Sequence, residues 1–349
     1  MCKTMKTKQL IRCLLLLCCT IPVTFSTFAQ DVHWSQFYTD VFRLNPAMTG
    51  NFNGDYRIGL NARNQWQSVP APYRTISAYA DFGLLKAQRR NGTQDWLGTG
   101  VNFLYDYAGD GRLSVMEVRG SVAGHKSLTR NVYVSAGVNA AFRQRSVDFQ
   151  KLYFGNQWGD VDFDPNLPNL ENLGAETFGY LDVNAGATVS YQVPEKFNFY
   201  LGASALHINR PDETFYDTGN RLGTRLAVNT GAAASVGNLI LEPAAYFTLQ
   251  KKAQEIVFGT NFVWVTNNGR YSRNSNNVNL YLGAWYRWND AVIALAGLEF
   301  SRYRLLLSYD INTSALRPAS NSRGGFELSF VHVGSFNRQP KTPIYCPRF

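Results

Sequence analysis

Between Asp55 and Val333 the chain is a succession of segments about ten residues long in which apolar and polar residues alternate. The segment from Tyr180 to Tyr191 shows this alternation best. Its apolar set is Leu181, Val183, Ala185, Ala187, Val189 and Tyr191, and its polar or small set is Asp182, Asn184, Gly186, Thr188 and Ser190. Because side chains of a β-strand point alternately to its two faces, each segment would have one apolar and one polar face. Backbone groups inside a bilayer must pair within the protein, which only helices and closed barrels allow. The pattern therefore predicts an all-β fold, a transmembrane antiparallel β-barrel.

Residues 1–29 have the composition of an export signal. An apolar run covers residues 13–19, and small residues at Thr27 and Ala29 provide a cleavage site. The basic region before the run consists of Lys3, Lys6, Lys8 and Arg12. Neither Cys18 nor Cys19 follows the small residues that a lipoprotein signal needs, which favours plain cleavage near Ala29 over lipidation. We therefore expect export to the cell outer membrane.

Composition excludes several classes of protein. After residue 29 no stretch reaches the roughly eighteen apolar residues of a membrane-spanning helix, which excludes a helical membrane protein. The formal net charge of +9 includes the cations of the signal, so the mature chain is only mildly basic and nucleic-acid binding is unsupported. The mature chain keeps only Cys346 and cannot form an internal disulfide.

The alternation predicts about fourteen strands, an even number as bacterial barrels require. Their expected ranges are 55–65, 74–84, 96–106, 113–126, 131–148, 180–192, 197–207, 224–236, 239–250, 255–265, 278–287, 291–300, 303–311 and 325–333. The longest linkers, 149–179 and 208–223, both join an odd strand to an even one. Barrels keep their long loops outside the cell, so this arrangement places both chain ends in the periplasm.

Four parts of the chain follow from this assignment. Residues 1–29 are the signal peptide, 30–54 a periplasmic N-terminal flank, 55–333 the outer-membrane β-barrel, and 334–349 a basic C-terminal tail. The tail contains three prolines, so it is expected to be extended, either as a solvated end or as a docking peptide.

No catalytic, cofactor or metal site is predicted. The four histidines His33, His125, His207 and His332 are scattered and have no Ser or Cys at a recognised spacing. Asp160, Asp162, Asp164 and Glu171 are spaced like calcium ligands, but Pro165 stands where such a loop needs glycine. An acidic surface loop is the favoured interpretation of this segment.

Charged residues fall on the polar side of several predicted strands. They are Arg57, Arg63, Glu117, Arg119, Arg143, Arg225, Glu242 and Arg287. Such charges are costly inside a barrel unless they are paired or hydrated. Two interpretations stay open: an interior ladder of ion pairs, favoured because acids are interspersed with bases, or a lumen selective for anions.

Three stretches carry a family resemblance. The first runs from Gln30-Asp31 through Trp34-Ser35-Gln36-Phe37-Tyr38 to Leu44-Asn45-Pro46-Ala47 and Gly50. The second is Arg63-Asn64-Gln65-Trp66 with residues 70–73 and Ser77. The third combines Tyr286-Arg287, Asp290-Ala291, Gly297, Ser308-Tyr309-Asp310-Ile311, Ser314 and Gly324-Gly325-Phe326-Glu327-Leu328-Ser329. Together with the ending Cys346-Pro347-Arg348-Phe349, they resemble the PorP/SprF family of outer-membrane proteins of the type IX secretion and gliding-motility systems of Bacteroidetes-type bacteria.

The resemblance implies a non-enzymatic barrel that supports secretion or surface anchoring of cargo. Its implied partners are type IX secretion components in the periplasm and outer membrane, secreted cell-surface cargo with a C-terminal signal domain, and outer-membrane lipid. The flanks would meet periplasmic partners, with Asn45, Pro46, Arg338, Lys341 and Arg348 as candidate docking residues, and the long outer loops would meet cargo. The resemblance also implies structural roles for Asn45, Pro46, Ser308, Tyr309 and Asp310. The alternatives are a porin-like solute channel, suggested by the charged lumen, and an adhesion protein that binds through its long loops.

Overall fold

The computed structural model describes residues 32–66, 72–88, 94–109, 111–159, 162–164, 166–171, 173–194, 196–216, 219–266, 278–314 and 320–336. Within these ranges no helix has the length and apolar character needed to cross a membrane.

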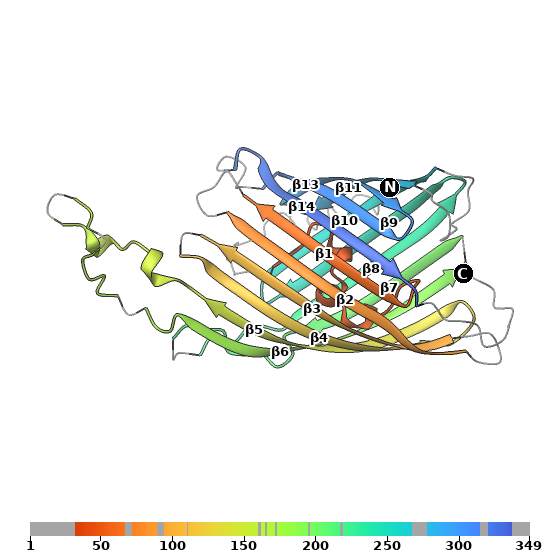
Figure 1. Ribbon diagram of the computed structural model, residues 1–349, viewed down its shortest axis with the longest axis horizontal. Coiled ribbons are helices and arrows are strands. Elements are labelled where there is room, and N and C mark those ends of the chain that lie inside the picture. Colours follow the sequence, from red (N-terminus) through yellow and green to blue (C-terminus); the bar gives the residue numbers. More distant parts are fainter. Residues whose placement is uncertain are drawn as a thin grey trace, which may run out of the picture. The chain divides into compact units, whose positions relative to one another are not determined.

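Fourteen antiparallel strands form a closed barrel (Figure 1). Each strand pairs with its neighbours in sequence, and β14 closes the ring by pairing with β1, for example Arg63 with Glu327. The strands are β1 (Tyr56–Gln65), β2 (Tyr73–Gln88), β3 (Gln94–Ala108), β4 (Leu113–Ser127), β5 (Val132–Ser146), β6 (Thr177–Val193), β7 (Phe197–Leu206), β8 (Arg225–Val236), β9 (Leu239–Gln250), β10 (Ala253–Val265), β11 (Val278–Arg287), β12 (Ala291–Phe300), β13 (Tyr303–Asn312) and β14 (Arg323–Gly334).

The all-β barrel expected from the alternation is confirmed. Every predicted strand corresponds to an observed one, and β9, β11 and β12 have the predicted bounds. The largest differences are in β2, β3 and β6, which are longer than expected. Their extra residues continue the hydrogen-bonded ladder past the point where apolar alternation ends, because strand pairing needs only backbone groups.

The two faces of the wall separate by residue type as the alternation predicts. In β6, the side chain of Leu181 is 62% exposed on the outer surface, whereas Asp182 and Asn184, on the inner face, are at most 1% exposed. The outer surface therefore carries an apolar band. The lumen is lined by polar residues together with an apolar cluster from β8 to β13 that includes Val263, Trp285 and Ile293.

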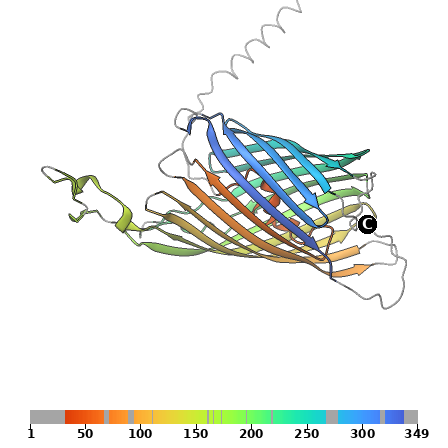
Figure 2. The same ribbon diagram turned by 45° about the horizontal axis from the view of Figure 1, so that its top comes forward.

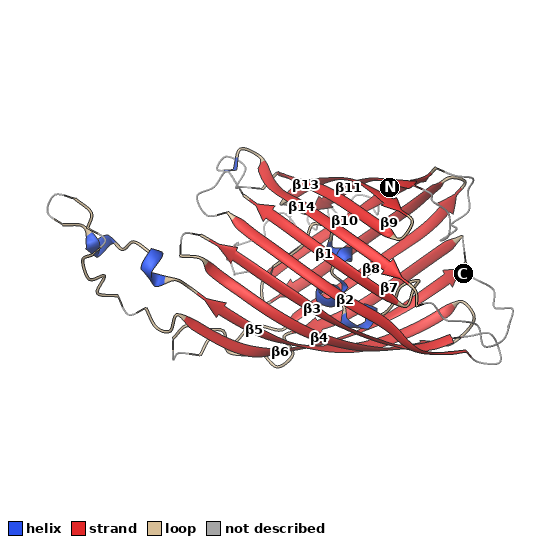
Figure 3. Ribbon diagram, viewed as in Figure 1, coloured by secondary structure: helices blue, strands red, loops and turns tan. Residues whose placement is uncertain are grey.

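The N-terminal residues 32–51 lie inside the barrel, and we call this segment the plug. It contains η1 (Phe37–Thr39), α2 (Val41–Leu44) and η2 (Pro46–Met48), each at most one turn long. Figure 3 shows these short helices in blue within the ring of red strands, and Figure 2 gives the same arrangement from a second direction. This position differs from the periplasmic flank expected for residues 30–54. The physical reason is that the plug supplies partners to polar wall groups that would otherwise be buried unpaired.

Two ends of the barrel are distinguished by their connections. The β5–β6 end carries the turns from odd to even strands, including the loop of residues 147–176, which holds η3 (Phe149–Lys151) and η4 (Gly155–Gln157) and extends beyond the strands in Figure 1. The opposite end carries the even-to-odd turns.

Candidate functional site

The plug is anchored at the β5–β6 end by the first of several polar clusters. The hydroxyl of Ser35 lies 2.7 Å from both carboxylate oxygens of Asp310 and accepts a hydrogen bond from Arg63 at 2.5 Å. The carboxylate of Glu327 accepts the backbone N–H groups of Ser35 and Gln36 at 2.8 and 2.9 Å. These wall residues lie at the ends of β1, β13 and β14, so this cluster fixes the start of the plug near one mouth of the barrel.

A second cluster lies halfway along the plug. The guanidinium of Arg43 donates to Glu117 at 2.9 Å, and the wall residues Arg119 and Arg143 bond the same carboxylate at 2.9 and 2.5 Å. The side chain of Glu117 has no exposed surface. Breaking a buried ion pair by removing one partner is strongly destabilising, so this carboxylate is central to the interior.

Asn45 connects the plug to three strands. Its amide nitrogen donates to the carbonyls of Ala187 and Ala203, both at 3.2 Å, and to the side chain of Asn229 at 3.1 Å. Its side-chain oxygen accepts the backbone N–H of Ala47, which caps η2. The residue has no exposed surface, so its hydrogen-bonding capacity is used inside the barrel.

The end of the plug is held near the opposite mouth. His125 contacts the carbonyl of Thr49 at 2.8 Å, and the N–H of Gly50 donates to Asp81 at 2.7 Å. The indole of Trp96 donates to the carbonyl of Gly50 at 2.9 Å. The plug therefore crosses the lumen from one end of the barrel to the other.

Glycines on the inner face of the wall provide room for the plug. A Cβ at Gly186 would lie 2.1 Å from the side-chain oxygen of Asn45, and one at Gly137 would lie 2.6 Å from the carbonyl oxygen of Pro46. Gly137 and Gly186 are directly paired on β5 and β6. Together they form a flat floor on which η2 lies, because any larger side chain at either position would collide with it.

Apolar contacts complete the fit. Phe37 stacks on Tyr246 with ring centroids 5.4 Å apart and meets Trp285 edge-on at 5.6 Å.

Beside the plug a cavity of about 10 Å³ lies against Arg43 and Arg119, which is room for about one water molecule.

The electrostatics of the plug reflect its burial. Desolvation raises the pKa of the Asp40 carboxyl above its ordinary value, although Arg43 and Arg119 oppose the shift. Desolvation likewise raises the pKa of the Tyr38 hydroxyl. Both groups are thus held more readily in their neutral forms than in water.

The charged residues predicted to face the lumen do so, and most form ion pairs. Arg57 pairs with Asp81 at 2.7 Å, and Arg287 pairs with Asp310 at 3.3 Å. Arg225 bonds the hydroxyl of Tyr246 at 2.6 Å. The contacts fit the interior ladder of ion pairs rather than an open lumen selective for anions.

The structure describes two of the five candidate docking residues, Asn45 and Pro46. Asn45 and Pro46 are buried in the lumen, where the wall surrounds them. Arg338, Lys341 and Arg348 lie outside the described residues. Of the residues expected to have structural roles, Ser308 accepts a hydrogen bond from Gln36 and Asp310 binds Ser35, whereas Tyr309 points to the outer surface with 43% exposure.

Sequence reasoning did not identify Ser35, Arg43 or the wall glycines as parts of one site. One signal was present: glycines such as Gly137 and Gly186 recur at inward positions, where a hollow barrel has no need of small residues. A flank rich in polar and aromatic residues, from Trp34 to Asp40, was a second signal of burial.

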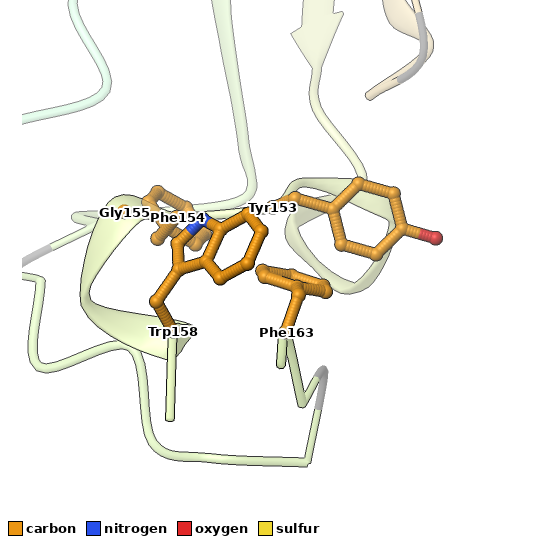
Figure 4. Close-up of a pocket in the computed structure, with 5 residues that line it drawn as sticks. All are labelled: Tyr153, Phe154, Gly155, Trp158 and Phe163. Carbon is orange, nitrogen blue, oxygen red and sulfur yellow. The ribbon is translucent and has the colours of Figure 1, made fainter. Parts of the chain in front are cut away.

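The loop between β5 and β6 carries a different feature, an open hollow of about 500 Å³. Figure 4 shows its lining by Tyr153, Phe154, Gly155, Trp158 and Phe163. The four residues of the calcium alternative, Asp160, Asp162, Asp164 and Glu171, all lie on this loop. Asp160 lies outside the described residues, and those described, Asp162, Asp164 and Glu171 included, contain no group of side chains able to hold a metal ion.

These features define a class: a β-barrel membrane protein whose lumen holds the chain's own N-terminal segment. The chain belongs to the family described as "Type IX secretion system membrane protein PorP/SprF", which it matches over residues 26–331. The family resemblance found in the sequence is thereby confirmed. A search of curated proteins finds no match.

Solved barrels resemble the chain at low sequence identity. The Ralstonia pickettii toluene transporter TbuX is 12% identical with a TM-score of 0.47, and the alignment covers 84% of this chain and 92% of that one. The Pseudomonas putida toluene transporter TodX is 9% identical with a TM-score of 0.48, and the alignment covers 83% of this chain and 91% of that one. The translocator domain of the autotransporter NalP from Neisseria meningitidis is 8% identical with a TM-score of 0.37, and the alignment covers 85% of this chain and 96% of that one.

Proposed function

We propose that this protein is a non-enzymatic outer-membrane component of the type IX secretion and gliding-motility machinery. It supports secretion or surface anchoring of cargo proteins by docking the cargo and components of the periplasmic machinery. Export through the signal peptide, with cleavage near Ala29, brings it to the outer membrane. Membership of the PorP/SprF family supports the assignment to this machinery.

The observation that carries the docking role is the occupied lumen. The plug is bonded to the wall near both mouths, by Ser35 and Gln36 at one end and by Thr49 and Gly50 at the other. A barrel filled in this way leaves little room for a solute or an unfolded chain. Its outer loops and its ends are then the surfaces available for docking.

The proposed docking surfaces lie at opposite ends of the barrel. With the β5–β6 end outside the cell, the loops of residues 147–176 and 207–224 face cargo, while the tail 334–349 faces the periplasm. The basic residues of the tail, Arg338, Lys341 and Arg348, would pair with acidic groups of a periplasmic partner. Asn45 and Pro46 would act indirectly, since they hold the plug.

The test is complementation of a deletion strain. Wild-type protein should restore secretion and surface display of cargo, and a variant with Arg338, Lys341 and Arg348 all changed to Gln should restore neither while reaching the outer membrane in normal amount. Affinity purification from solubilised outer membranes should recover periplasmic machinery with the wild type and lose it with the variant. Unchanged secretion of every cargo after deletion would refute the proposal.

The second candidate is a solute channel, the alternative that the charged inward positions suggest in the sequence. Purified protein in a planar bilayer should then conduct with the plug in place. Under the docking proposal wild-type protein conducts little.

A further inference from the structure

The loop of residues 147–176 has a charge opposite to that of the chain as a whole. It contains six acidic residues and a single basic one, Lys151, in a protein with a formal net charge of +9. The acidic residues are Asp148, Asp160, Asp162, Asp164, Glu171 and Glu176. A local concentration of negative charge of this kind attracts cationic partners and repels anionic ones.

The same loop exposes large apolar side chains. Trp158 is 66% exposed, Tyr153 is 71% exposed and Leu170 is 84% exposed. Two of these surround Phe163, whose ring lies 5.2 Å from that of Tyr153 and 5.9 Å from that of Trp158. The result is the open hollow of about 500 Å³ in Figure 4, whose walls are mostly aromatic carbon. Exposed tryptophan and tyrosine in such a setting are typical of interaction sites.

The loop holds the hollow in shape through its own hydrogen bonds. The side chain of Gln157 accepts from the N–H of Phe154 and donates to the carbonyl of Leu167, both at 2.9 Å. The backbone of Gln157 accepts from Asp164 at 3.0 Å, and Trp158 forms a β-bridge with Phe163. A surface arranged before binding loses less conformational entropy when a partner arrives.

We infer that the β5–β6 loop is a docking surface for a polypeptide segment that carries basic side chains beside an aromatic or aliphatic anchor. The anchor enters the hollow between Tyr153 and Trp158, and the basic side chains meet the carboxylates of Asp162 and Asp164. The identification of that segment as part of a secreted cargo rests on the proposed function; the binding chemistry does not.

The chemistry favours polypeptide over the other molecules at a cell surface. Phosphorylated or uronic-acid polysaccharides would be repelled by the acidic residues. A neutral sugar needs hydrogen-bonding groups around its aromatic platform, and the five residues that line the hollow supply few.

The experiment measures binding to the full-length barrel in nanodiscs of zwitterionic lipid. The probes are two fluorescein-labelled dodecapeptides, one alternating lysine with tryptophan and leucine, the other with glutamate in place of every lysine. Maltoheptaose serves as a neutral sugar competitor. Fluorescence polarisation should show that the lysine peptide binds at least tenfold more tightly than the glutamate peptide, with an affinity that falls as salt rises. Maltoheptaose should not displace it.

Three variants test the location. Trp158→Ala should weaken binding of the lysine peptide at least fivefold, and Asp162→Asn with Asp164→Asn should weaken it and flatten the salt dependence. Trp288→Ala is the matched control, because Trp288 is also an exposed tryptophan, 56% exposed, in the turn between β11 and β12; it should bind like wild type. Replacement of residues 150–172 by a short Gly-Ser linker measures binding to the nanodisc lipid and to the rest of the barrel.

Equal binding of the two peptides, displacement by maltoheptaose, or unchanged binding by the linker variant would overturn the inference. Failure of the proposed function is read separately, from secretion in cells. A barrel that binds the lysine peptide at this loop but is dispensable for all secretion would keep the inference and refute the function.

Discussion

The plug and the β5–β6 loop are both irregular segments with short helical turns, yet they use similar residues in opposite ways. Trp34 in the plug is 4% exposed, whereas Trp158 in the loop is 66% exposed. The aromatic residues of the plug pack against the wall, and those of the loop surround an open hollow. The comparison teaches that tertiary contacts, rather than local sequence, decide whether an aromatic segment stabilises the fold or is available to a partner.

The carboxylates of the two regions differ in the same way. Burial raises the pKa of Asp40 in the plug, whereas a hydrogen bond from Lys151 lowers the pKa of Asp148 on the exposed loop. Charge is therefore costly in one region and readily carried in the other.

The largest expected effect comes from removing the floor of the plug. Gly186→Leu places a side chain where η2 lies, since even a Cβ there would be 2.1 Å from Asn45. We expect the plug to leave its position and ion conductance to rise several-fold over wild type in a planar bilayer. Gly124→Leu is the control: a Cβ at Gly124 meets nothing within 4 Å, and conductance should stay low. Equal conductance of the two variants would contradict the role assigned to the floor.

The next effect concerns the buried carboxylate of the middle cluster. Glu117→Gln leaves Arg43, Arg119 and Arg143 without their shared anion and should lower the free energy of unfolding by about 3–5 kcal/mol. Urea titration in lipid vesicles, followed by tryptophan fluorescence, measures the change. Glu299→Gln is the comparison, because Glu299 pairs with Arg304 and its side chain is 18% exposed, whereas that of Glu117 has no exposed surface. This substitution should lower the free energy of unfolding clearly less than Glu117→Gln does. If both substitutions lower the free energy of unfolding by the same amount, the middle cluster contributes no more to stability than the pair of Glu299 and Arg304.

Loss of a plug hydrogen-bond centre should have a smaller effect. Asn45→Ala removes four hydrogen bonds and leaves the carbonyls of Ala187 and Ala203 without this donor. We expect a loss of about 1–3 kcal/mol. The same titration tests it, and a variant as stable as wild type would show that the plug contributes little to folding.

A pH dependence distinguishes the buried from the exposed carboxylates. The pKa of Asp40 is raised in the folded state, so its ionisation destabilises the fold at pH values above that raised pKa, and the cost disappears as pH falls toward the ordinary value of about 3.9. Asp40→Asn should therefore be more stable than wild type at neutral pH, with the difference closing as pH falls. Unfolding midpoints from pH 4 to pH 8 measure this; a stability difference that does not vary with pH would count against the assignment.

The smallest effect is expected in the loop. Trp158→Ala removes an exposed ring and should change the free energy of unfolding by less than about 0.5 kcal/mol. A loss comparable to that of a buried aromatic residue, about 3–5 kcal/mol, would mean that the loop supports the fold and would remove the contrast with the plug.

The barrel was predictable because strand identity here is a local property. Alternation with a period of two appears within about ten residues, so each strand from β1 to β14 could be located, and its inward side could be assigned wherever one side is polar. In β12 the inward side is mostly apolar, with Ile293 and Leu295 buried there. The pairing order followed because short turns connect neighbours along the chain. The charged inner positions could be found for the same reason, but their partners could not.

The sequence by itself thus determined the strands, the two faces of the wall, the acidic character of the β5–β6 loop and the membership of a secretion family. Only the tertiary structure decided that residues 32–51 lie in the lumen. Ser35 and Glu327 are separated by 292 residues, and no pattern in the sequence identifies one as the partner of the other. The physical reason is that closure of the barrel creates a polar interior only after all strands are paired, and its carboxylates, guanidiniums and glycine floor then fit one segment of the same chain.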